Sequence, residues 1–350
     1  MEFRHRLLKE IYDQPKAISD TLKNCLGSIN SFVPERPFPR NIIFLGMGSS
    51  YFSSIYAEYL FSGLSEVDVE AILASEQLYY PKRIDSRSLV LAISQSGESI
   101  ETVKVVKKLK RSGARIWSIT NSANSTLAEL ADRSLLTYAG EEKCSATKTF
   151  LSTLVLLYML WANIGVSRGN FSEELVEEAA RRIAMISEII RDSLHSWNAL
   201  CQPLASKVNS SRSMIILGRG YNFCTALQSS LILKEVSKVH AEAMNGGQYR
   251  HGPIELTDPR FLIVSLATGV TEHLMASISR ECRMSGGTAI LIADSEQFAN
   301  ESDILVDKVD ESLSPLLLTV PLELIAYHVA VLKGRNPDSG EYMTKITGIE

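Results

Sequence analysis

Apolar positions along the chain follow two patterns that alternate. The run Leu89–Gly97 begins with consecutive apolar residues (LVLAI) and ends at glycine, which predicts a short strand covered on both faces. The segment Ile100–Arg111 instead spaces Val103, Val106 and Leu109 along one face of a helix. Buried strands separated by such helices are typical of a parallel α/β sheet.

Three landmarks of this kind occur twice, in the same order, about half the chain apart. The offset is 172 residues for two of the pairs and 173 for the third. The pairs are Ile43–Gly48 with Ile215–Gly220, Leu89–Gly97 with Phe261–Gly269, and Ser112–Gly113 with Ser285–Gly286. We therefore predict an α/β fold of two domains, each a doubly wound parallel sheet flanked by helices, related by internal duplication.

This duplication implies five parts of the chain. They are an N-terminal helical segment (1–36), a first domain (37–172), a helical connector (173–210), a second domain (211–333) and a C-terminal tail (334–350). Within the second domain, the apolar segment Leu316–Val331 predicts a further helix.

The composition is that of a globular protein, with 45% hydrophobic residues, 22% charged residues and a net charge of −4. Basic and acidic residues are interspersed, so no basic stripe predicts nucleic-acid binding. The five cysteines are scattered without a CxxC pair, which indicates reduced thiols in a cytoplasmic protein and no metal site. The charged start MEFRHRLLKE is not typical of a signal peptide. Phe150–Val166 is short for a membrane span and contains polar residues, so we expect a buried helix in a soluble protein.

Small hydroxyl residues follow two predicted strands of the first copy. One turn is Gly46–Ser50 (GMGSS) and the other is Ser94–Ser99 (SQSGES). Ligands of parallel sheets bind beyond the carboxyl ends of the strands, where helix N-termini favour anions. These turns are suited to binding a phosphate monoester; the alternative is that their serines only cap helices. A dinucleotide-binding motif is incomplete here, because Tyr51 stands where its third glycine would be. The second-copy turns 218–221 and 266–269 lack most of the hydroxyls, so we expect one phosphate site.

Three further polar residues lie in unusual surroundings. Glu235 is a carboxylate in an otherwise apolar helix, His251 lies in a glycine-rich connection, and Lys345 lies in the tail. Taken singly, each is more typical of a structural or solvated residue than of a catalytic one.

Short motifs that follow one another over nearly the whole chain resemble those of a known family. They are Leu8–Pro15, Gly48–Tyr51, Ala74–Glu76, Ser94–Ser99, Thr147–Phe150, Lys234–Ser237, His240–Ala243, Tyr249–Pro253 and Ala326–Gly334. In these motifs the chain resembles the isomerase half of glucosamine-6-phosphate synthase (glutamine–fructose-6-phosphate aminotransferase), built from two sugar isomerase (SIS) domains. Because the sequence starts at the opening of that module, we expect a stand-alone isomerase without the glutaminase domain.

The resemblance implies a role for each matching residue. The residues that would bind the substrate, including its 6-phosphate group, are Gly48, Ser49, Ser50, Ser94, Gln95, Ser96, Ser99 and Ser145. Glu235, as a buried carboxylate of raised pKa, would move a proton between C1 and C2. His251 would assist ring opening from the neighbouring subunit of a homodimer, and Lys345 would form a Schiff base with the ketose C2. No cofactor and no metal is implied.

Two departures from the family pattern affect the expected reaction. Ile232 replaces an active-site lysine, and Ala146 falls where the synthase has a ligand-contacting serine, for which Ser145 is the substitute. We expect an amino-sugar phosphate isomerase/deaminase that converts glucosamine 6-phosphate and water to fructose 6-phosphate and ammonia. The alternatives are an ammonia-dependent synthase supplied by a separate glutaminase subunit, a fructosamine-6-phosphate deglycase, and a sugar-phosphate sensor without catalysis.

Overall fold

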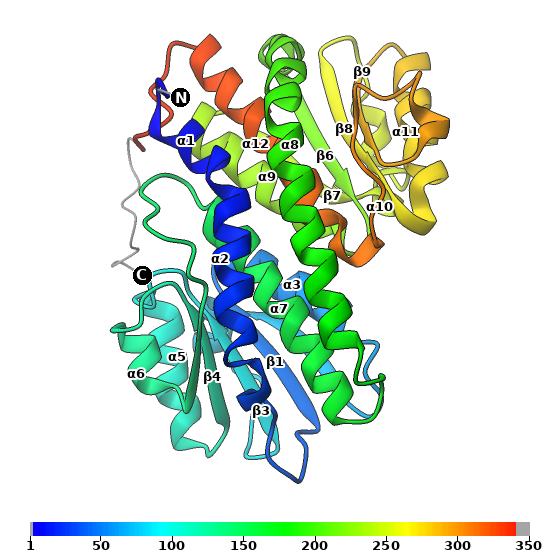
Figure 1. Ribbon diagram of the computed structural model, residues 1–350. Coiled ribbons are helices and arrows are strands. Elements are labelled where there is room, and N and C mark those ends of the chain that lie inside the picture. The colour runs from blue at the N-terminus through cyan, green and yellow to red at the C-terminus, as the bar shows by residue number, and fades with distance from the viewer. Residues whose placement is uncertain (1–2, 341–350) are drawn as a thin grey trace. The chain divides into compact units, whose positions relative to one another are not determined.

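The computed structural model describes residues 3–340, which form two compact units. The first unit comprises residues 13–142 and 146–187, and the second comprises residues 3–12, 143–145 and 188–340. A long helix, α8 (Leu175–Ser210), begins in the first unit and ends in the second. Figure 1 shows the elements coloured along the chain.

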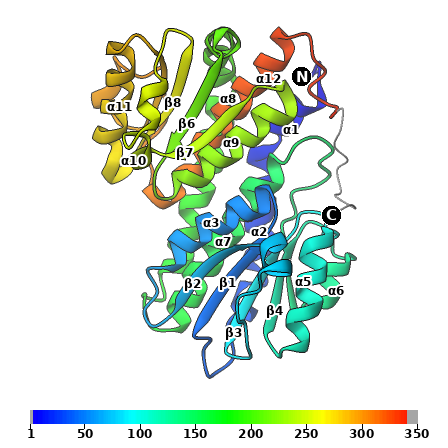
Figure 2. The same cartoon turned by 180° about the vertical axis from the view of Figure 1, so that it is seen from behind.

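The first unit is built on a five-stranded parallel sheet of order β2-β1-β3-β4-β5. Helices α2, α3 and α7 lie on one face of this sheet, and α4, α5 and α6 lie on the other (Figures 1 and 2). The strands are Asn41–Gly46 (β1), Asp68–Leu73 (β2), Ser88–Ile93 (β3), Arg115–Thr120 (β4) and Arg133–Leu136 (β5). The helices are Gln14–Leu26 (α2), Ser49–Phe61 (α3), Ala74–Tyr79 (α4), Ile100–Arg111 (α5), Thr126–Leu130 (α6) and Lys148–Ser167 (α7).

The second unit repeats this arrangement with a sheet of order β7-β6-β8-β9-β10, again all parallel. Helices α9 and α12 lie on one face, whereas α10 and α11 lie on the other. The strands are Ser213–Gly218 (β6), Ala241–Asn245 (β7), Phe261–Ala267 (β8), Thr288–Ala293 (β9) and Ile304–Leu305 (β10). The helices are Arg6–Tyr12 (α1), Asn222–Ser237 (α9), Gly246–Tyr249 (α10), Glu272–Met284 (α11) and Ser314–Leu332 (α12).

The predicted fold class is confirmed, because the two units have the same strand order and equivalent helices. Every residue of the central strands β3 and β8 is buried, as continuous apolar runs require in a sheet covered on both faces. The expected helix Ile100–Arg111 is α5 with the same bounds.

Two helices of the described chain are long and apolar enough to cross a membrane, namely α7 and the segment Glu311–Leu332 that contains α12. Both are instead buried, over 89% and 83% of their most apolar stretch. The burial of α7 against α2 and α3 confirms the buried helix expected at Phe150–Val166.

Two carboxylates bind the short helix α1 to distant parts of the chain within the second unit. Asp338 accepts hydrogen bonds from the backbone N–H groups of Arg6 and Leu7, each at 2.8 Å. These groups lie at the start of α1, where the helix itself supplies no acceptor. On the same helix, buried Glu10 accepts from the backbone N–H groups of Lys143 and Cys144.

Candidate functional site

The two hydroxyl-rich turns of the first unit start side by side at one edge of the sheet. They follow β1 and β3, which are hydrogen-bonded neighbours in parallel register. The strands next in sequence lie on opposite sides, since β2 lies beyond β1 and β4 lies beyond β3. This reversal is the topological switch point at which ligands of doubly wound sheets bind. The strand order therefore brings Gly48, Ser49 and Ser50 to the same edge as Ser94–Ser99.

The turn after β1 is tight and leads directly into α3, which begins at Ser49. A Cβ on Gly46 would lie 2.7 Å from the carbonyl carbon of Ser50, so only glycine lets the chain turn this closely. Ser49 and Ser50 are half-buried, and their hydroxyls lie at the N-terminus of α3. A helix N-terminus presents unpaired backbone N–H groups to an anion.

The turn after β3 folds around its own serine hydroxyls. The Ser94 hydroxyl accepts from the backbone N–H of Gly97 at 3.2 Å, and the Ser96 hydroxyl accepts from the N–H of Glu98 at 3.1 Å. The Ser99 hydroxyl lies 3.3 Å from a carboxylate oxygen of Glu101. These contacts order the loop while Gln95, Ser96 and Ser99 stay partly exposed.

Gly97 fixes the shape of this turn. It has a φ of +69°, and an added Cβ would lie 2.0 Å from Oγ of Ser125. Close packing against the β4–α6 connection is therefore possible only without a side chain.

The equivalent turn of the second unit already contains an anion from the chain itself. The carboxylate of Glu311 accepts from the backbone N–H of Val270 at 3.1 Å, directly after Gly269 at the start of η3 (Gly269–Thr271). A Cβ on Gly269 would lie 1.9 Å from the carboxyl carbon of Glu311. In the first unit the corresponding donor, the N–H of Glu98, is bound by a neutral serine hydroxyl. The two copies thus differ in charge at the same place in the fold.

Glu142 organises the start of α7, a role that the sequence did not suggest. Its buried carboxylate accepts four hydrogen bonds, from the backbone N–H and the hydroxyl of both Thr147 and Thr149. It therefore satisfies donors at the helix N-terminus that have no partner in the helix. Ser145 and Ala146 precede this turn and are both half-buried. Ser145 belongs to the second unit, unlike the other candidate phosphate-binding residues.

Glu235 lies near the C-terminal end of α9 and is half-buried. This carboxylate, expected to be buried, is thus partly shielded from solvent. The preceding residue, Lys234, donates to the Ser230 hydroxyl at 2.7 Å, and desolvation lowers the pKa of its ammonium against the opposing effect of Glu242. Ile232, the departure from the family pattern, is buried in the core.

Two candidates remain, His251 and Lys345. His251 is exposed in the connection between α10 and η2 (Pro253–Leu256), with its backbone N–H bound to the Gln248 carbonyl. Lys345 lies outside the described residues. Within residues 3–340, no group of three or more His, Cys, Asp or Glu side chains is placed to hold a metal ion.

Comparison with known proteins places this two-copy α/β architecture in a family. The SIS domain model matches residues 39–162 and 207–333. The chain belongs to the SIS domain family. It is 35% identical over 353 residues to the glutamine–fructose-6-phosphate aminotransferase [isomerizing] of Thermococcus kodakarensis, covering 99% of this chain and 58% of the relative. The protein of the same name from Pyrococcus horikoshii is 36% identical over the same shares.

Solved structures show the same fold. The C-terminal domain of glucosamine-fructose-6-phosphate aminotransferase from Francisella tularensis has a TM-score of 0.87 at 27% identity, covering 96% of this chain and 98% of that one. The glucosamine-6-phosphate deaminase of Thermotoga maritima has a TM-score of 0.78 at 22% identity, covering 97% and 98%. The chain thus spans somewhat under 60% of the curated relatives' length but nearly all of these two solved structures.

Proposed function

We propose that this chain is a phosphosugar isomerase that acts on amino-sugar 6-phosphates, most directly as a deaminase of glucosamine 6-phosphate. The observation that carries the proposal is the difference between the two copies. The Ser94–Ser99 turn lies at a switch point with neutral donors, whereas Glu311 occupies its counterpart. One copy thus offers a place for a phosphate monoester, and family membership supports that ligand.

In the proposed reaction, the serines hold the 6-phosphate and His251 assists opening of the sugar ring. Glu235 then takes the proton from C2 of the open-chain aldehyde and returns it to C1, while one proton of the C2 amine passes to O1. The aldehyde thereby becomes the C1 alcohol and the C2 amine becomes an imine. Water adds to the imine carbon, and the resulting carbinolamine transfers its hydroxyl proton to nitrogen and releases ammonia, which leaves the C2 ketone. The products are fructose 6-phosphate and ammonia, and Lys345 is the proposed residue for a transient imine at C2.

The aminating direction is the second candidate, because the curated relatives are named glutamine–fructose-6-phosphate aminotransferases. The same proton transfers run in reverse would join ammonia to fructose 6-phosphate. In that case a glutaminase would supply the ammonia, either from a separate subunit or from a further part of the same protein. Both candidate reactions include a homodimer in which His251 of one subunit reaches the active site of the other.

The test is an incubation of the purified chain with glucosamine 6-phosphate, with ammonia and fructose 6-phosphate both measured. We expect equal amounts of the two products, and loss of both in Glu235→Gln. Glu177→Gln is the matched control, because that carboxylate is exposed on α8 and is not among the proposed site residues. Formation of glucosamine 6-phosphate from fructose 6-phosphate and ammonium, without the forward reaction, would favour the aminating candidate. Turnover by Glu235→Gln equal to that of the unmodified chain would refute the proton-transfer role.

A further inference from the structure

A groove on the surface of the first unit lies between α4 and α5, away from the turns already described. Its volume is about 370 Å³, and it is lined by Leu78, Tyr79, Lys104, Lys107, Lys108 and Arg111. Four of these six residues are cations and none is acidic. A pocket of this size falls in the range of small-molecule sites, about 300–1,000 Å³.

The four cations form one stripe along α5, at spacings of three and four residues. All four are exposed, and Lys108 donates to the Leu78 carbonyl at 3.3 Å. The one acidic residue of α5, Glu101, is buried in the first turn. Like charges at these spacings repel one another on a helix. The helix dipole favours the cations of the last turn only, so it does not explain Lys104 or Lys107.

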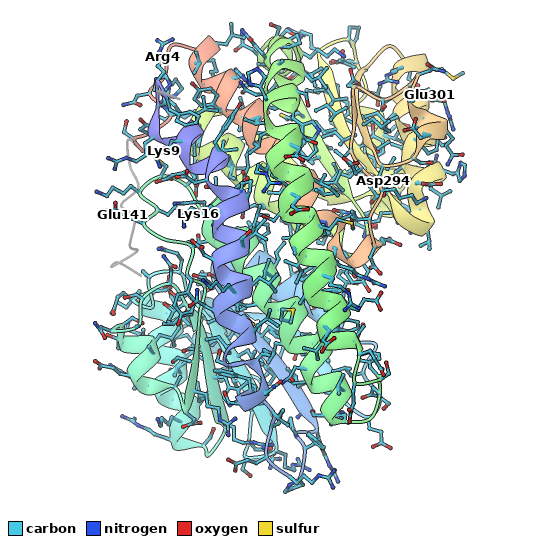
Figure 3. All side chains as sticks on the ribbon, viewed as in Figure 1. Arg4, Lys9, Lys16, Glu141, Asp294 and Glu301 are labelled. Carbon is cyan, nitrogen blue, oxygen red and sulfur yellow. The ribbon has the colours of Figure 1, made fainter. Side chains whose placement is uncertain are left out.

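The duplicated helix α11 shows that the fold does not require this stripe. There the cations are neutralised, because Arg280 pairs with Glu301 and Arg283 pairs with Asp303, both at 3.1 Å. Glu301 is labelled in Figure 3, which shows the side chains of both units. The expectation that basic and acidic residues are interspersed therefore does not hold on α5, where residues 104–111 contain five basic residues and no acidic one.

One exposed tyrosine adjoins the cations. Tyr79 lines the groove and is 62% exposed. An aromatic face beside lysine and arginine side chains combines a stacking surface for a base with charges for phosphates. We propose that this groove binds a nucleoside diphosphate, with the phosphates on Lys107, Lys108 and Arg111 and the base against Tyr79.

This site is distinct from the proposed sugar-phosphate site. None of the six residues that line the groove belongs to the Ser94–Ser99 turn. Since α5 begins at the Ser94–Ser99 turn, the groove and that turn nevertheless share one helix.

The test is calorimetric titration of the full chain with ADP, pyrophosphate and adenosine, in a buffer free of magnesium. We expect saturable binding of ADP, tighter than that of pyrophosphate. The double variant Lys107→Glu/Arg111→Glu should weaken ADP binding by at least about tenfold. The matched control Lys23→Glu/Arg260→Glu reverses two exposed cations elsewhere and should change it by less than about twofold. Tyr79→Ala should remove the advantage of ADP over pyrophosphate.

Three results would overturn the proposal. The first is the absence of saturation by ADP up to about 1 mM, a concentration that corresponds to only about −4 kcal/mol of binding free energy. The second is equal ADP affinity in the unmodified chain and the Lys107→Glu/Arg111→Glu variant, which would place the ligand elsewhere. The third is binding of pyrophosphate as tight as that of ADP, because the groove would then recognise charge alone.

Discussion

Asp294 is a buried carboxyl group whose ionisation opposes folding of the second unit. It directly follows β9 and is 5% exposed, and its Oδ1 atom has no hydrogen-bond partner (labelled in Figure 3). Burial raises the pKa of Asp294 to about 6; the charge of Lys308 lowers it, while those of Glu272 and Glu311 raise it. We predict that Asp294→Asn stabilises the protein at pH 7.5.

The size of the effect follows from the difference between the folded and unfolded pKa. The ordinary value is 3.8 and the folded value is about 6, and each pKa unit corresponds to about 1.4 kcal/mol. The folded state keeps its proton to higher pH than the unfolded chain. The free energy of unfolding therefore falls as pH rises from about 4 to about 6, by up to about 3 kcal/mol, and stays low above that range. Asparagine carries no charge and avoids this cost.

The first copy already has asparagine at the equivalent position. Asn121 follows β4 as Asp294 follows β9, at the offset of 173 residues that relates the duplicated segments. Its Oδ1 accepts from the Thr137 hydroxyl at 2.7 Å and from the Ala139 N–H at 3.1 Å. The duplicated fold therefore accommodates an uncharged amide at this place.

The assay is urea unfolding followed by circular dichroism between pH 4.5 and 8. The difference between Asp294→Asn and the unmodified chain should grow from about 1 kcal/mol at pH 4.5 to about 3 kcal/mol in favour of the variant at pH 7.5. Glu296→Gln, an exposed carboxylate in the next turn, should show a small difference that does not change over this range. A variant that is less stable at pH 7.5, or a difference independent of pH, would refute the reasoning.

Three further predictions concern the first unit and the thiols. Glu142→Ala should lower the free energy of unfolding by about 2–4 kcal/mol, because it leaves buried donors unsatisfied. Glu141→Gln, at the exposed neighbouring position, is the control. Equal melting temperatures of the two variants would contradict this prediction. Gly97→Ala should destabilise more than Gly140→Ala in a thermal melt, because both have positive φ but only the first clashes. Equal melting temperatures would exclude the clash. Burial raises the pKa of three thiols, those of Cys25, Cys201 and Cys224, to about 12. A disulfide reagent at pH 8 should therefore modify them only after the protein is unfolded in urea. Rapid modification of the folded protein would contradict their burial.

The sequence predicted the elements well where local pattern decides them. The helical spacing of α5 gave its bounds, and the continuous apolar runs identified the buried central strands. Duplication then implied equal strand order, which brings the turns after β1 and β3 together. These features depend on periodicity and on neighbouring residues, so a single sequence contains them.

The parts that were missed depend on contacts between residues distant in sequence. No local signal shows that Glu311 reaches the turn at Val270, which lies 41 positions earlier in the chain. The basic residues of α5 are also clustered in the sequence, with no acidic residue from 102 to 128, but only the fold shows that four of them line one groove with Tyr79. Glu235 was expected to be a buried carboxylate, and only the packing of α9 shows that its side chain is half-buried.

The assignment of α1 to the second unit determines the order in which the chain can complete its folds during synthesis. Residues 13–187 contain the first unit of the described chain and leave the ribosome early. Helix α1 is made before them, but the carboxylate that binds its N-terminus belongs to Asp338. At about 5–20 residues per second, α1 waits roughly 15–65 s for that partner. Its core side chains Leu7 and Ile11, fully buried at the end, are exposed to water or to a chaperone throughout that interval.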